Sequence, residues 1–255
     1  MVKYKALTTI YIKQFYKYPI PLFIKLIYVP VEAFIYIFLW NYLGKSSSVD
    51  INYMIIYYIL IGLIKSAYPF RHISINIQRD VMEGSISNVL VRPYPYILPE
   101  MARYTAWIFL YSFIFIPAII FVIVVRNVSV YYAILFVLSF AIGNMIQFLV
   151  WYNVGLIALK IERIRGVLLG VSALMSFTSG SLVPLFLLPQ WMEQVTYLFP
   201  FRYYMYFPLQ TMIGEISLPD YMVSLALSFV WCVILWGLSA VQLRSGMSKL
   251  QANCA

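Results

Sequence analysis

The sequence carries little charge, two cysteines and a single histidine. Charged residues make up 11% of its 255 residues, whereas soluble domains carry about 25%. A soluble globular domain is excluded because its surface needs polar groups. Disorder is excluded because the chain is too apolar. The net charge of +9 does not indicate a nucleic-acid-binding module, since the cations flank apolar runs and form no patch.

Apolar and aromatic residues take the place of charge. The apolar share is 63% and the aromatic share 18%, and the mean hydropathy is +0.85. These values indicate a polytopic membrane protein. Six spanning helices of about 20 residues each leave no stretch long enough for a typical soluble domain. We therefore expect any catalytic or energising domain to lie on another chain.

Six apolar runs predict six transmembrane helices, over roughly 22–43, 53–70, 104–125, 131–159, 166–188 and 221–243. The first run is too long and too late for a signal peptide, and no cleavage pattern follows it. We expect an all-α integral membrane fold in three parts. An interfacial helix covers residues 1–20, the six-span domain covers 21–245, and a cytoplasmic tail covers 246–255.

Orientation follows from the distribution of Lys and Arg. With a cytoplasmic N-terminus, the inner side holds Lys3, Lys5, Lys13, Lys17, Lys25, Arg71, Arg79, Arg92, Arg103, Lys160, Arg163, Arg165, Arg244 and Lys249. The outer side holds Lys45, Arg126 and Arg202, and Lys65 falls within a run. This asymmetry predicts a plasma-membrane protein with both termini in the cytoplasm and an even number of spans.

The segment before the first run has helical periodicity. Its apolar residues share one face: Tyr4, Leu7, Ile10, Tyr11, Phe15 and Tyr18. Lysines lie largely on the other face, which suits a helix in the inner membrane interface. A positive leader that only sets the topology is the alternative. Pro19 and Pro21 end this helix before the chain enters the bilayer.

The longest cytoplasmic connection, about residues 71–103, predicts a short helix with charges on one side. Its apolar residues need a partner surface, which a merely solvated connector leaves unexplained. Gly84 can end or bend the helix. Three prolines, Pro93, Pro95 and Pro99, prevent a long continuous one.

This connection resembles the corresponding loop of ABC-2 type transporter permeases, in which a charged stretch, Gly-Ser or Gly-Thr, an apolar pair and a Pro follow the second span. The matching residues are Arg79, Asp80, Glu83, Gly84, Ser85, Val89, Leu90 and Pro93. The resemblance covers essentially the whole chain and is nearest to short permeases that occur beside a second permease. It implies a coupling helix that docks on a separate ATP-binding subunit, formed by Arg79, Asp80, Met82, Glu83, Gly84, Ser85, Val89 and Leu90.

The connection between the fifth and sixth runs is too apolar for a free loop and too rich in proline for a spanning helix. Short re-entrant or interfacial helices fit best, because irregular backbone at membrane depth needs protein or water around it. Its Pro-Gln-Trp and Phe-Pro-Phe sequences resemble the element that caps the pathway of ABC-2 permeases. The resemblance implies an outer gate at Pro189, Trp191, Phe199 and Pro200. A plain aromatic belt is the alternative.

Polar residues within the runs are candidates for a pathway or a polar core. Glu32 and Lys65 differ in depth by roughly 6 Å at about 1.5 Å per residue, so we predict a contact or a shared polar cavity. Lys65 reaching the inner interface is the alternative. Asn144 and Gln147 either line a pathway or bond helices together. Pro117 predicts a kink.

Enzymatic functions do not fit the sequence. Gly44-Lys45-Ser46 is not a P-loop, because Leu39 occupies the position of its first glycine. Ser179 and Ser181 lack a histidine base within reach, since the only histidine, His72, lies on the opposite side of the bilayer. No cluster of ligands indicates a metal site.

We therefore expect the permease subunit of an ATP-driven exporter that binds no cofactor itself, with ATP and Mg²⁺ on the partner. The expected assembly has two ATP-binding subunits and a second permease, like or unlike this chain. An amphipathic or lipophilic substrate, as in multidrug efflux, and the direction of transport follow from the resemblance. A polysaccharide or glycolipid exporter of the same superfamily is one alternative. A secondary carrier or channel using Glu32 is another, although no inverted repeat is evident.

Overall fold

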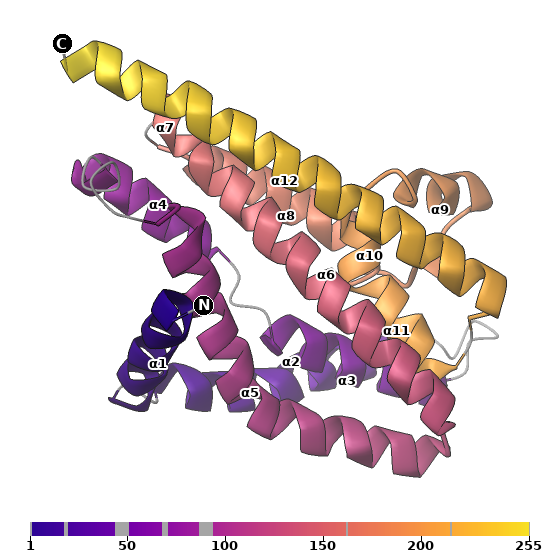
Figure 1. The fold of residues 1–255 in the computed structure, drawn as a ribbon. Helices are drawn as coiled ribbons and strands as arrows, with labels where there is room; N and C mark the ends of the chain where they lie inside the picture. Colours follow the sequence, from indigo (N-terminus) through magenta and orange to yellow (C-terminus); the bar gives the residue numbers. More distant parts are fainter. Residues whose placement is uncertain are drawn as a thin grey trace.

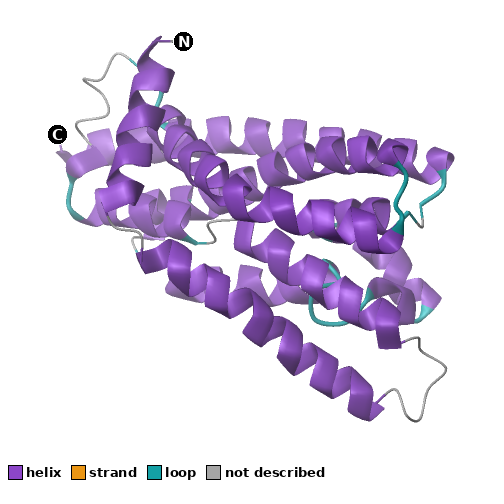
Figure 2. Cartoon of the chain, turned by 90° about the horizontal axis from the view of Figure 1, so that it is seen from below, coloured by secondary structure: helices purple, strands orange, loops and turns teal. Residues whose placement is uncertain are grey.

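The computed structural model describes residues 2–17, 20–43, 51–67, 71–86, 94–161, 163–214 and 216–254, and all regular structure within these ranges is helical (Figure 2). The helices are α1 (Val2–Lys17), α2 (Ile20–Leu43), α3 (Ile51–Ala67), α4 (His72–Met82), α5 (Ile97–Arg126), α6 (Val130–Leu156), α7 (Ala158–Ile161), α8 (Arg165–Thr178), the 3-10 helix η3 (Leu185–Leu187), α9 (Gln190–Thr196), α10 (Phe201–Tyr204), α11 (Tyr206–Ile213) and α12 (Leu218–Cys254).

The long helices pack side by side, and the short helices gather at the two ends (Figure 1). α12 lies along α6, α2 along α3, and α1 along α5. α9, α10 and α11 lie together beside the N-terminal half of α6 and the start of α12, whereas α4, α7 and the C-terminal end of α12 lie toward the other end of α6. The chain thus has two ends with different elements, separated by the length of its longest helices.

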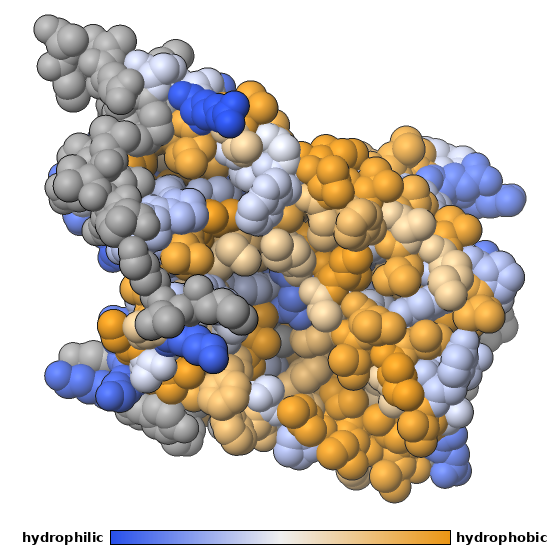
Figure 3. Space-filling model, in the orientation of Figure 1, coloured by the Kyte–Doolittle hydropathy of each residue, from blue (hydrophilic) through white to orange (hydrophobic). Residues whose placement is uncertain are grey.

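Large apolar side chains cover the outside of these helices. Phe38 on α2 is 70% exposed and Phe121 on α5 is 68% exposed. Figure 3 shows hydrophobic side chains over most of the described part of one face, with strongly hydrophilic ones mainly toward its margins. A surface of this kind is stable in lipid and not in water. Together with the helix composition, it shows that the chain is a membrane protein.

Two helices in the described ranges are long and apolar enough to cross a bilayer, Val130–Ile161 and Leu218–Gly246. A third qualifies if Ile97–Phe113 and Phe115–Val124, which meet at 47°, form one span. The predicted kink at Pro117 is confirmed by this bend. A proline lacks the N–H that would bond to the carbonyl four residues earlier and its ring crowds that carbonyl.

The fifth apolar run is helical over only part of its length. α8 ends at Thr178, and Gly180 follows with φ of +78°, a left-handed conformation that favours glycine. Pro184 and η3 continue the chain without returning to an α-helix. The sequence run 166–188 therefore contains a short helix and an irregular segment, which turns toward α9.

Close backbone contact fixes how α10 packs on α6. A Cβ atom at Gly143 would lie 3.0 Å from the Cα of Tyr204 on α10. Tyr203 and Tyr204 are buried there. Lipid supplies no hydrophobic force between helices, so such close packing and hydrogen bonds between elements hold the bundle together.

Candidate functional site

α4 packs on α6 through a short face of small and aliphatic side chains. Ile73, Ser74 and Ile77 are buried. Ser74 donates a hydrogen bond to the main-chain oxygen of Trp151 on α6. One turn further along α6, a Cβ atom at Gly155 would lie 2.9 Å from the Ser74 Cα. The absence of a side chain at Gly155 therefore lets the two backbones approach.

The C-terminal end of α4 is exposed. Met82 is 58% exposed, and Arg79 and Glu83 beside it are also exposed. Gly84, at φ of +68°, ends the helix, and its N–H donates to the Val81 carbonyl. The prediction that Gly84 ends or bends this helix is confirmed. An exposed methionine between opposite charges provides a surface for a protein partner.

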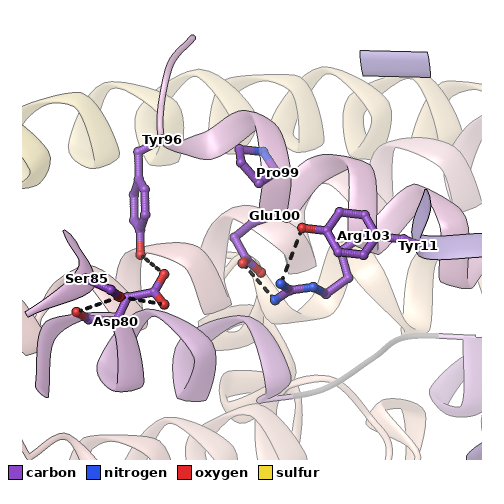
Figure 4. Close-up of a pocket in the computed structure, with 7 residues that line it drawn as sticks. All are labelled: Tyr11, Asp80, Ser85, Tyr96, Pro99, Glu100 and Arg103. Carbon is purple, nitrogen blue, oxygen red and sulfur yellow. Dashed lines mark hydrogen bonds and ion pairs between the residues drawn. The ribbon is translucent and has the colours of Figure 1, made fainter. Parts of the chain in front are cut away.

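A polar cavity of about 220 Å³ lies behind this helix end, where α1, α4 and α5 meet (Figure 4). Its lining residues are Tyr11, Asp80, Ser85, Tyr96, Pro99, Glu100 and Arg103. Asp80 and Ser85 lie on one side, and the side chains of α1 and α5 lie on the other. The lining includes no histidine or cysteine, so it suits the positioning of helices better than nucleophilic catalysis.

Asp80 joins the end of α4 to the start of α5. Its carboxylate accepts hydrogen bonds from the Tyr96 hydroxyl at 2.9 Å and from the Ser85 hydroxyl at 3.3 Å. Burial raises the pKa of Tyr96, and the nearby Asp80 carboxylate raises this pKa further. The phenol therefore stays protonated at neutral pH and remains a donor to Asp80.

α1 is fastened to the start of α5 by a second polar group. Arg103 pairs with Glu100 at 2.8 Å, donates to the Tyr11 hydroxyl at 3.4 Å, and lies 4.9 Å from the centre of the Tyr11 ring. The hydroxyls of Tyr4 and Thr105 are 2.6 Å apart. Together with Asp80, these contacts make the cavity a joint between three helices. We call it the cytoplasmic joint, after the side of the membrane on which the sequence predicts it to lie.

The bond between Tyr96 and Asp80 gives a first testable prediction. Tyr96→Phe keeps the ring and removes the donor to a charged acceptor, a bond worth about 1.5–3 kcal/mol. We expect amide hydrogen exchange at residues 79–84 to become about tenfold faster or more. Tyr94→Phe is the matched control, because the Tyr94 hydroxyl makes no hydrogen bond within the described residues. Equal exchange in the two variants would contradict a role for Asp80 in holding the end of α4.

The structure places six of the predicted coupling residues together at the end of α4: Arg79, Asp80, Met82, Glu83, Gly84 and Ser85. Val89 and Leu90 lie outside the described residues. Docking on a partner stays a prediction. The sequence interpretation missed Tyr96 and Glu100 as members of this site. The spacing of Glu100 and Arg103, which allows an ion pair on a helix, was the available signal.

The end of the molecule opposite α4, which the sequence predicts to be the outer end, is organised around Arg202. The sequence interpretation counted this residue only as an outer cation. Arg202 is 4% exposed and donates to the Thr196 hydroxyl at 2.7 Å and to Glu193 at 3.3 Å. Its guanidinium lies 3.7 Å from the ring centre of Tyr197 and 4.8 Å from that of Tyr206. A lone cation among aromatic residues was the signal for this cluster.

The four predicted gate residues lie in or just before the short helices α9 and α10, which contribute Glu193, Thr196 and Arg202 to this cluster. Pro189 precedes α9 and Pro200 precedes α10. The Phe199 ring stacks on Phe201 with centroids 6.3 Å apart, and Trp191 is 66% exposed. The prolines set the starts of the two helices, since the fixed φ of proline suits a helix start. A gating role for these residues stays a prediction.

The polar residues within the helices have defined contacts. The Lys65 Nζ lies 2.6 Å from the Glu32 Oε1, so the predicted contact between these side chains is confirmed. The Tyr104 hydroxyl lies 3.1 Å from both the main-chain and side-chain oxygens of Asn144, which joins α5 to α6. Gln147 is 1% exposed, and its amide has no hydrogen-bond partner within the described residues. A role in a pathway stays a prediction for all four predicted residues.

The fold and this site define a class: an all-helical membrane protein in which a joint of three helices supports an exposed helix end. A family model described as ABC-2 family transporter protein matches residues 49–254. The chain therefore belongs to the ABC-2 family of transporter proteins. This family supplies the membrane subunits of transporters, which typically have no catalytic function, and associates in general with ABC ATP-binding subunits. Neither curated proteins nor solved structures gave a match.

Proposed function

We propose that the chain is the permease subunit of an ATP-driven exporter, docked on its ATP-binding subunits through the exposed end of α4. The observation that supports this most is the position of that end. Met82 and Glu83 are exposed at the tip, while Asp80, one turn away, bonds to Tyr96 at the start of α5. A force applied to the tip therefore reaches the helices of the membrane domain through the cytoplasmic joint.

Six spans account for the family pattern in this proposal, since each of the six apolar runs overlaps one helix: α2, α3, α5, α6, α8 and α12. Both termini then lie in the cytoplasm of a plasma-membrane protein. α1 lies at the inner interface, with Lys5, Lys13 and Lys17 exposed. The distribution of Lys and Arg supports this orientation, as does the position of α4 and α7 at the same end as the chain termini (Figure 1).

A second permease completes the pathway in this proposal, and α8 offers a face for it. Gly166, Gly170 and Ala173 are exposed on one side of α8, and no atom lies within 4 Å of a Cβ built at either glycine. Small residues at this spacing allow a second helix to approach closely. The face suits a copy of this chain or an unlike permease.

An amphipathic compound is the substrate class that the membrane domain supports. A groove of about 190 Å³ between α5 and α6 is mainly apolar, with a few polar groups. Its lining residues are Met101, Tyr104, Thr105, Ile108, Ala141, Asn144, Met145 and Phe148. An apolar surface with few polar groups is typical of sites for such ligands.

The test is to purify the tagged chain from gently solubilised membranes and to identify the proteins that accompany it by mass spectrometry. We expect an ABC ATP-binding subunit in an equal amount. Met82→Asp combined with Glu83→Lys should remove it, whereas Met192→Asp should not. Met192 is a matched control because it is 38% exposed at the opposite end of the molecule.

A chain that purifies without an ATP-binding subunit in several mild detergents would contradict the proposal. Transport by this chain alone in liposomes without ATP would then favour a carrier or channel. An unlike permease in an equal amount would identify the second half of the pathway.

A further inference from the structure

The irregular segment after α8 is bonded to α3 by two adjacent tyrosines. The Tyr57 hydroxyl donates to the main-chain oxygen of Gly180 at 2.7 Å, and the Tyr58 hydroxyl donates to that of Leu182 at 3.1 Å. Tyr57 is completely buried. Main-chain oxygens in a non-helical segment lack the partners that a helix supplies, so these phenols satisfy carbonyls that would otherwise be costly in a membrane.

The packing around this contact is close. Gly180 has φ of +78°, and a Cβ atom there would lie 2.8 Å from the Tyr57 hydroxyl oxygen. The Phe186 ring meets Tyr57 edge-on at 6.2 Å and Tyr53 edge-on at 5.4 Å. Hydrogen bonds and aromatic contacts therefore both hold the segment from Gly180 to Phe186 against the N-terminal part of α3.

A third tyrosine makes the same kind of bond to a main-chain oxygen, between α5 and the C-terminal part of α3. The Tyr111 hydroxyl on α5 donates to the main-chain oxygen of Leu63 on α3 at 3.3 Å. Tyr111 belongs to the part of α5 before its bend, Ile97–Phe113. The same straight part carries Glu100 and Arg103 of the cytoplasmic joint. A movement of the joint therefore displaces the donor of the bond to α3.

α3 connects these contacts as one uninterrupted helix, Ile51–Ala67. Leu63 and Tyr57 are separated by about 9 Å along it, at about 1.5 Å per residue. α3 also pairs with α2, through Lys65 and Glu32 and through the stacked rings of Tyr58 and Tyr36, whose centroids are 4.1 Å apart. These contacts join α3 to α2, to α5 and to the segment after α8.

We propose that α3 transmits the movement of the cytoplasmic joint to the outer segment, with Tyr111, Tyr57 and Tyr58 as positioning residues. This inference rests on the proposed function and goes beyond it by naming the connecting elements. A hydrogen bond shielded from water is stronger than an exposed one, and no water is present to replace either partner. α5, α3 and residues 180–186 therefore move together. Ring packing without the hydroxyls would allow one element to slide past the next.

The experiment measures whether nucleotide at the ATP-binding subunit changes the accessibility of the outer segment. The parent carries Cys232→Ala, Cys254→Ser and Leu187→Cys, and it is used as the full complex in proteoliposomes. Leu187 is 37% exposed and lies at the end of η3. The labelling rate with a membrane-impermeant maleimide is compared between the nucleotide-free and the ATP–vanadate-trapped complex, and ATP hydrolysis is measured on the same samples.

We expect the labelling rate of the parent to depend on nucleotide. Each of Tyr57→Phe, Tyr58→Phe and Tyr111→Phe should reduce this dependence by about two- to tenfold, the effect of one hydrogen bond, while ATP hydrolysis continues. Tyr36→Phe is the control. Its ring stacks on Tyr58, and its hydroxyl makes no hydrogen bond within the described residues, so the dependence should be retained.

The result for Tyr111→Phe separates transmission from a local effect on the outer segment. Tyr111 does not contact that segment by any bond described above, so a loss of nucleotide dependence there supports transmission. Unchanged dependence in all three variants, with hydrolysis intact, would overturn the inference and leave the proposed function standing. A parent complex that hydrolyses ATP but is labelled at the same rate in both states would overturn the inference alone, whereas a parent without ATP hydrolysis would overturn both. If the Tyr57 variant fails to fold, the Tyr58 and Tyr111 variants decide the outcome.

Discussion

Replacing Glu32 by glutamine is expected to destabilise the packing of α2 on α3 by about 3–5 kcal/mol, the cost of breaking a buried ion pair. The Glu32 and Lys65 side chains are 10% and 18% exposed, and their charged atoms lie 2.6 Å apart. The neutral amide would leave the Lys65 ammonium poorly compensated in a mostly buried position. The lower end of this range is expected, since Lys65 retains some exposure through which water can reach its ammonium.

Thermal unfolding in mild detergent measures this effect, with the recovery of folded protein as a second readout. Lys65→Met should be destabilising for the same reason, because it leaves the Glu32 carboxylate unpaired. The double variant Glu32→Leu with Lys65→Met is the control, since replacing both members of a buried pair by apolar residues is often neutral or stabilising. Single variants as stable as the parent would contradict a structural role for the pair.

The same variants distinguish the pair as a structural contact from an ion site. The Glu32 Oε2 atom is buried and has no hydrogen-bond partner within the described residues, as expected for either role. A stable double variant that still transports substrate would show that no carboxylate is needed for transport. A stable double variant without transport would favour a direct role for Glu32 in the pathway.

Replacing Gly155 by valine is expected to uncouple the cytoplasmic joint from its ATP-binding subunit. A Cβ atom at this position would lie 2.6 Å from the Ile77 Cδ1 and 2.9 Å from the Ser74 Cα. The Ile77 side chain can rotate, but the α4 backbone at Ser74 has to move. Overpacking of this kind costs about 1–3 kcal/mol, which shifts the equilibrium between docked and displaced α4 by roughly 5- to 150-fold.

The measurements are the amount of ATP-binding subunit recovered with the chain and the rate of ATP hydrolysis by the complex. Both should fall in Gly155→Val, while the chain itself remains in the membrane fraction. Gly237→Val on α12 is the matched control, because no atom lies within 4 Å of a Cβ built at Gly237. Full recovery of the ATP-binding subunit with Gly155→Val would show that the seat of α4 on α6 does not govern docking.

Helix ends and bends were the most predictable parts of the fold. Gly84 ends α4 with a positive φ, and Pro117 lies shortly after the bend of α5 between Phe113 and Phe115. Both effects arise from the backbone of the residue and of the turn before it. The run 166–188 was less informative. Gly180 ends the helical part early, although hydropathy continues unchanged through the irregular segment that follows.

Contacts between helices were predictable only for charged side chains, because few oppositely charged partners lie at a similar depth in the membrane. Glu32 and Lys65 are the two charges that we placed within the runs, so their pairing followed from depth and cost. The partners of Arg202 and of Asp80 did not follow, because each was one of many aromatic or polar residues at similar positions. The contacts of four predicted pathway and gate residues likewise became clear only from the structure. These residues are Asn144, Gln147, Trp191 and Phe199.

The sequence alone therefore determined the class of protein, its helical and apolar character and its membership of the ABC-2 family. Hydropathy and backbone preference are properties of neighbouring residues along the chain, so they can be recognised without the fold. Only the tertiary structure decided which face of α4 is buried, which tyrosines bridge α3 to its neighbours, and how the cytoplasmic joint is assembled. In a bilayer, an apolar side chain gains no hydrophobic free energy by moving from the lipid into the bundle, because lipid tails are as apolar as the protein interior. Hydrophobicity therefore does not mark the contacts, and they depend on the rotation and close approach of helices far apart in sequence.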